Sequence, residues 1–106
     1  MAIRDQQKVR LSAVAGTFYE GDSLLLRRRL AEAEGKLPPP DPQAPAVRGV
    51  VLPHAGYLFS LPTAMAAMAP LRKRQVSRVI LLGPSHYIGF RGIAVPTFNR
   101  WRTPFG

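Results

Sequence analysis

The chain has 106 residues, of which 46% are hydrophobic and 20% are charged, a composition typical of one small globular domain and not of a disordered tail. It contains no cysteine, which excludes a disulfide framework, a cysteine-based zinc finger and a thiol nucleophile. No apolar stretch approaches the roughly 18 residues that a membrane span requires, and the N-terminus has no signal-peptide core. We therefore expect a soluble, cytoplasmic protein that does not contact a membrane.

The net charge of +9 reflects missing acids rather than an excess of bases. All six carboxylates precede residue 42, where seven Lys and Arg nearly balance them, whereas residues 42–106 hold eight Lys and Arg and no Asp or Glu. A catalytic or metal site in that second half must work without carboxylates or receive them from elsewhere. Nucleic acid is the weakest partner hypothesis, because aromatic residues that could stack on bases are not interleaved with these basic residues.

The first part of the chain predicts one helix between two irregular segments. The apolar and aromatic run Ala13–Tyr19 predicts an ordered loop or a short strand. Asp22 or Ser23 can cap a helix, and apolar residues then recur at i, i+4 and i+7, which predicts an amphipathic helix over 23–34. Its three consecutive arginines are expected on a solvated face. Residues 38–46 are a proline-rich connector, because proline lacks the N–H that helices and ladders need.

After the connector the pattern becomes that of an α/β protein with a mostly parallel sheet. Two apolar runs, residues 47–52 and 79–82, predict buried strands, and a third strand is expected at about 92–96. Between the first two, residues 62–69 predict a buried helix that ends or kinks at Pro70. Strand, helix and strand in this order make a crossover, which places helices on the faces of a parallel sheet.

This set of elements leaves part of the predicted sheet uncovered. Two or three strands with one crossover helix expose a sheet face and at least one edge. We therefore expect residues 1–106 to form a single, incomplete α/β domain, the front part of a larger one. A second copy of the chain could also supply the cover, which leaves homo-oligomerisation open.

The chain has two histidines, and each follows one of the two predicted buried strands. His54 lies in the sequence PHAGY at 53–57, and His86 lies in GPSHY at 83–87. Ligands bind outside the carboxyl ends of strands in open α/β sheets, where neighbouring strands lie about 4.8 Å apart. Two imidazoles placed there can bind one metal ion at roughly 2.1 Å each. We predict a metal site at this pair, although a single such histidine is more often a hydrogen-bonded loop residue.

An esterase is a weaker hypothesis for the second of these loops. GPSHY resembles a nucleophile elbow, but tyrosine occupies its fifth position and the second half has no acid that could orient a base. Ser85 is expected to hydrogen-bond within its own turn.

Four motifs in order resemble the MEMO family, whose bacterial and archaeal members are called AmmeMemoRadiSam system protein B. They are AVAGTFY at 13–19, PHAGY at 53–57, RVILLGPSH at 78–86 and the closing Thr103-Pro104. The family's fold is similar to that of class III extradiol dioxygenases, an α/β/α arrangement in which two histidines and a third ligand hold non-haem Fe(II). The resemblance therefore implies that fold for this chain.

The resemblance also implies a metal site and a pocket beside it. His54 and His86 match the family's two metal-binding histidines, and the pocket residues expected beside them are Phe18, Tyr19, Tyr57 and Ser85. Fe(II) is the first expectation for the metal and copper the second. The family's third ligand is a cysteine far downstream, and this chain has no cysteine, so the third ligand is expected from beyond residue 106.

Two functional hypotheses follow, and the sequence leaves open whether the protein is an enzyme. In the first, Fe(II) brings O2 and a small aromatic diol into one coordination sphere, which is oxidative, dioxygenase-like chemistry. In the second, the chain is a binding module whose pocket takes an acidic or phosphorylated peptide. That pocket would be ringed by Phe18, Tyr19 and Tyr57 and by basic side chains such as Arg10. No residue is predicted to be catalytic.

Overall fold

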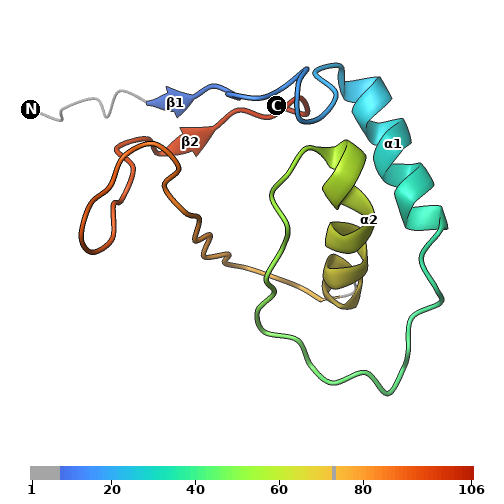
Figure 1. Cartoon of the computed structure of the whole chain (residues 1–106). Coiled ribbons are helices and arrows are strands. Elements are labelled where there is room, and N and C mark those ends of the chain that lie inside the picture. The colour runs from blue at the N-terminus through green and yellow to red at the C-terminus, as the bar shows by residue number, and fades with distance from the viewer. Residues whose placement is uncertain (1–7, 73) are drawn as a thin grey trace, which may run out of the picture.

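The computed structural model describes residues 8–72 and 74–106 as a small α/β protein with two α-helices and a two-stranded parallel sheet (Figure 1). This confirms the α/β class that the sequence predicted, but the two paired strands are not among the predicted ones. The elements in chain order are β1 (Val9–Arg10), α1 (Ser23–Gly35), α2 (Tyr57–Met68), the 3-10 helix η1 (Ala69–Leu71) and β2 (Arg100–Trp101).

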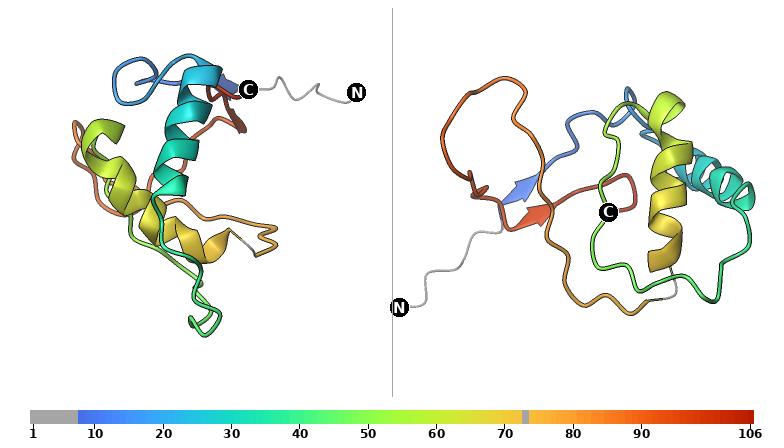
Figure 2. Two further views of the ribbon diagram at one scale, coloured as in Figure 1. Left: turned by 90° about the vertical axis from the view of Figure 1, so that its right-hand side faces the viewer. Right: turned by 60° about the horizontal axis from the view of Figure 1, so that its bottom comes forward.

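The short sheet joins the two ends of the described chain. Val9 pairs with Arg100 and Arg10 with Trp101, so β1 and β2 lie side by side in Figure 1 and in the right-hand view of Figure 2. The Ser12 hydroxyl extends this contact by donating to the Arg102 carbonyl at 2.6 Å. The sheet thereby brings the C-terminal turn into reach of α1.

Helix α1 forms where the sequence predicts it, because its signals are local. The Asp22 carboxylate accepts hydrogen bonds from the backbone N–H groups of Leu24 and Leu25, both at 2.9 Å, and so satisfies two donors that the first turn leaves free. Leu26 faces inward and is 4% exposed. The helix ends at Gly35, one residue beyond the predicted end.

Helix α2 begins five residues before the predicted start, at Tyr57 and not at Pro62. The N–H of Tyr57 donates to the Phe18 carbonyl at 2.7 Å, so a distant loop satisfies the first donor of the helix. Pro62 lies inside the helix and has no N–H to donate to the carbonyl of Leu58, four residues earlier. Leu58 is exposed, so water can donate to this carbonyl instead. Pro70, as predicted, follows the end of the α-helix.

The small core lies between the two helices, which pack side by side (Figure 2). Its buried apolar residues are Leu26 and Leu61, the latter 5% exposed. Ser60 is also buried, and its hydroxyl donates to the Ala55 carbonyl at 2.7 Å. Residues 38–46 form neither helix nor strand. No helix of the described chain has the length and apolar character to span a membrane.

The three strands predicted in the second half do not form. Residues 47–52, 79–82 and 92–96 belong to no ladder, and Val51, Leu81 and Ile93 are 97%, 89% and 84% exposed. A strand needs hydrogen bonds to a neighbour, and among residues 8–72 and 74–106 only β1 and β2 form a ladder, apart from an isolated bridge between Ala15 and Tyr19 in the first loop. The predicted crossover with a buried, mostly parallel sheet is therefore wrong for the chain as it stands.

The chain consequently exposes far more surface than a compact protein of its mass. Its accessible area is 10,023 Å², against roughly 5,900 Å² for a folded monomer of 11.7 kDa. The radius of gyration is 16.7 Å, where about 13 Å is usual at this length. The apolar runs 47–52, 79–82 and 92–96 account for much of the exposed apolar surface.

Asp22→Ala tests the cap of α1. We expect the substitution to destabilise the helix by about 1 kcal/mol, because two N–H groups lose their acceptor. This corresponds to roughly fivefold faster amide exchange at Leu26, measured by NMR. Asp41→Ala is the matched control, since Asp41 accepts from the N–H of Gln43 in the connector and touches no helix. Equal exchange in wild type and Asp22→Ala would contradict the capping role.

Candidate metal centre

The two histidines meet although 32 residues separate them in the chain. The Nε2 atoms of His54 and His86 lie 3.1 Å apart, and the ring centroids lie 5.2 Å apart with the planes tilted by 42°. Both residues are exposed, so the pair can be reached from solvent. At this distance one Nε2 donates a hydrogen bond and the other accepts it, so the two nitrogens point toward each other.

Different local contacts position each histidine. His54 lies two residues before Gly56, which precedes α2, and this helix start is held by the hydrogen bond from Tyr57 to Phe18. His86 lies in a turn in which the Ser85 hydroxyl donates to the Ile88 carbonyl at 2.6 Å. Ser85 thus bonds within its own turn, as its position after Gly83-Pro84 predicts.

The distance between the two nitrogens suits a shared metal ion. Two nitrogen ligands that each lie about 2.1 Å from one ion are roughly 3.0 to 3.4 Å apart at angles between 90° and 109°. Imidazole nitrogen binds iron, copper and zinc. No group of three or more His, Cys, Asp or Glu comes together in the described residues. Within the described residues, the pair can offer two nitrogen ligands to one ion, and no third candidate ligand lies with it.

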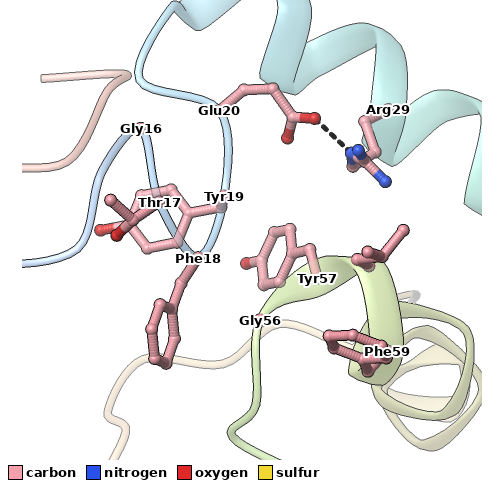
Figure 3. Close-up of a pocket in the computed structure, with 10 residues that line it drawn as sticks. Gly16, Thr17, Phe18, Tyr19, Glu20, Arg29, Gly56, Tyr57 and Phe59 are labelled. Carbon is pink, nitrogen blue, oxygen red and sulfur yellow. Dashed lines mark hydrogen bonds and ion pairs between the residues drawn. The ribbon is translucent and has the colours of Figure 1, made fainter.

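Three of the four predicted pocket residues line one hollow of about 240 Å³ (Figure 3). Phe18 and Tyr19 contribute one wall from the first loop, and Tyr57 contributes the other from the start of α2. The rings of Tyr19 and Tyr57 are 5.6 Å apart and tilted by 42°. Ser85 is not among the residues that line it, and neither is His54 or His86, so the hollow does not include the histidine pair.

The basic residue of this pocket is Arg29, and Arg10 lies instead in β1. Arg29 belongs to the run of three arginines in α1 that the sequence places on a solvated face. Arg27 and Arg28 are exposed as predicted, but Arg29 is half-buried because its Nε donates to Glu20 Oε1. The nine-residue separation of this ion pair follows no helical spacing, so only the folded loop reveals it.

The ion pair also sets the ionisation of Glu20. The hydrogen bond from Arg29 holds the pKa of the Glu20 carboxyl below its ordinary value of 4.5, aided by a backbone hydrogen bond and by the arginine charge and opposed by burial. Its other oxygen, Oε2, is buried and has no hydrogen-bond partner in the described part of the chain. At neutral pH the pocket therefore carries a carboxylate and a guanidinium that largely cancel.

Arg29→Gln tests this assignment by NMR titration of the Glu20 side chain. We expect a wild-type midpoint below 4.5 and a midpoint that rises toward 4.5 in the variant, because the donor that favours the charged carboxylate is gone. The ion pair is then intact above the lowered pKa and is lost as the pH falls through it. Arg28→Gln removes the same charge from the neighbouring position and should leave the midpoint in place. A wild-type midpoint at or above 4.5 would refute the assignment.

Comparison with known proteins agrees with the motifs. The profile of the family described as "Memo-like protein" matches residues 10–106. The memo-1 homolog of Caenorhabditis elegans is 33% identical over 100 residues, which cover 94% of this chain and 28% of that protein.

A MEMO1 family protein of Methanopyrus kandleri is 38% identical over 104 residues, covering 92% of this chain and 37% of that protein. A MEMO1 family protein of Sulfurisphaera tokodaii is 34% identical over 107 residues, with 92% and 38% covered. The chain thus spans about a third of the length of these curated relatives. No solved structure matches it. The match of the family profile over nearly the whole chain shows that this protein belongs to the Memo-like family.

Proposed function

We propose that this chain supplies His54 and His86 as two ligands of a redox-active divalent metal, with Fe(II) as the first candidate and copper as the second. The observation that carries the proposal is the 3.1 Å separation of the two Nε2 atoms, which are brought together from positions 32 residues apart. For both nitrogens to bind one ion, their hydrogen bond has to break, and the donating Nε2 has to give up its proton to solvent while its ring takes the Nδ1–H tautomer. Both residues are exposed, so an ion can enter without opening a core.

The chemistry of the ligands narrows the choice of metal. Mg²⁺ and Ca²⁺ prefer oxygen ligands, and residues 42–106 contain no carboxylate that could provide them. Neutral imidazole favours iron, copper and zinc, and copper binds such sites more tightly than iron at equal availability. The resemblance to a fold with non-haem iron ranks Fe(II) first. Zinc serves as the redox-inert comparison.

We further propose that the pocket at the start of α2 holds a small aromatic substrate for oxidative chemistry. Fe(II) bound at the pair would supply Lewis acidity and redox chemistry to an aromatic diol. The chain's own contribution is to orient the substrate. The rings of Tyr19 and Tyr57 pack against each other, with centroids 5.6 Å apart, and form an aromatic edge of the pocket, while Gly56 links Tyr57 to the loop of His54. Because the relatives are about three times as long, the remaining parts of the site are expected from the rest of the family's length.

A binding module for an acidic or phosphorylated peptide is the second candidate. Arg29 beside aromatic walls favours it, because guanidinium pairs with carboxylate and phosphate. Glu20 weighs against it, because this carboxylate already occupies the Arg29 Nε and repels an anion. Metal chemistry therefore ranks first.

Metal content tests the first candidate. The chain is purified under anaerobic conditions, loaded with Fe(II), desalted and analysed for metal, and the experiment is repeated with copper and zinc. We expect about one ion per wild-type chain and at least a tenfold weaker affinity in His54→Ala and in His86→Ala, because one imidazole alone cannot chelate.

Tyr87→Ala is the matched control for these variants. Tyr87 is 99% exposed, makes no hydrogen bond in the described chain and meets His86 only through a ring edge, with the centroids 6.4 Å apart, so its removal should leave metal content unchanged. Metal that stays bound to both histidine variants, or a folded wild-type chain without metal, would refute the proposed site.

Peptide binding separates the two candidates. With a phosphotyrosine peptide as the probe, a binding module predicts affinity that survives both histidine substitutions and falls about tenfold in Arg29→Gln, because a charge-assisted hydrogen bond is lost. Metal chemistry as the main function predicts no measurable binding of this peptide to the metal-free wild type. Fluorescence anisotropy of the labelled peptide measures both cases.

A further inference from the structure

The segment 75–98 depends on one histidine for its connection to the rest of the protein. Every residue in it is exposed. At one border Arg74 donates to the Val47 carbonyl, and at the other the Asn99 N–H donates to the Lys8 carbonyl at 3.1 Å. Between these borders, the contact of His86 with His54 is the one hydrogen bond or ion pair that joins the segment to distant residues among those the structure describes.

The two histidines also occupy matching places in the sequence. His54 follows the apolar run 47–52 by two residues, and His86 follows the run 79–82 by four. Joining the two side chains therefore brings the C-terminal ends of both runs near each other. These runs are strongly exposed, with Val51 at 97% and Leu81 at 89%, so each has apolar surface to cover.

A hydrogen bond between exposed imidazoles is a weak tether, because water competes for both nitrogens. A metal ion that binds both imidazoles is a stronger tether. The free energy of metal binding can offset the entropy that is lost when the chain around the two ligands becomes ordered. Closing a long loop in this way removes many conformations of the open chain. The loop from His54 to His86 spans 32 residues.

We propose that the metal acts as a clip: ligation by His54 and His86 orders the segment 75–98 and aligns the run 79–82 with the run 47–52. The metal then has a structural role in addition to any redox role. The inference rests on the proposed metal site, and it adds that ligand binding and local folding of the second half are one coupled event. His54 is the fixed side of the clip, because its loop is held by Tyr57 and Ser60, and His86 is the side that becomes fixed.

Hydrogen–deuterium exchange of the full chain, read by mass spectrometry, tests the clip. The probes are Zn(II), which avoids oxidative damage, and Fe(II) under argon. We expect exchange in peptides that cover 79–86 to slow by at least about fivefold when metal is added. Peptides from the connector 38–46 should be unchanged and serve as the internal reference.

Variants and metal content make the outcome decisive. The slowing should vanish in His86→Ala and in His54→Ala and persist in Tyr87→Ala, while amide protection of α1 stays equal in all four proteins and shows that they remain folded. About one metal per chain without slowing at 79–86 would overturn the clip and leave the metal site standing. A folded wild-type chain without metal would overturn both. Slowing that persists in His86→Ala would place the effect elsewhere and overturn the clip.

Discussion

One backbone hydrogen bond, from the N–H of Tyr57 to the carbonyl of Phe18, sets the arrangement on which the rest of the structure depends. The first donors of a helix have no partner inside it, and here the early loop provides one. The bond fixes where α2 begins, which in turn packs the Tyr57 ring against Tyr19 and brings the start of α2 to the pocket that both tyrosines line. It also holds the loop of His54, two residues before the helix cap, in the position from which this side chain meets His86.

The distribution of charge explains why imidazole is the expected ligand chemistry. With no carboxylate after residue 41, the second half offers histidine as its strong metal-binding side chain, and both histidines are used in one contact. In the first half of the chain, Glu20 and Arg29 form an ion pair at the pocket, and their opposite charges nearly cancel there. The result is a neutral, aromatic hollow, which suits a small aromatic molecule better than an anion.

A few contacts between residues far apart in the sequence hold the described chain together, and its hydrophobic core is small. Two apolar side chains, Leu26 and Leu61, are buried between α1 and α2, and the apolar runs of the second half stay in solvent. The chain spans about a third of the length of its curated relatives. The contacts that remain, at β1–β2 and at the histidine pair, therefore carry more of the tertiary organisation than in a compact domain.

The sequence by itself determined the features whose causes are local. Asp22 and the apolar period that follows it were enough to predict α1, and Pro70 was enough to predict where α2 stops, because helical hydrogen bonds reach only four residues along the chain. The motifs also identified the family and singled out the two histidines. Tertiary structure decided what depends on distant partners: the start of α2 at Tyr57, the pairing of β1 with β2, and the contact of Glu20 with Arg29. The predicted strands failed for the same reason, since an apolar run becomes a strand only when another strand lies beside it.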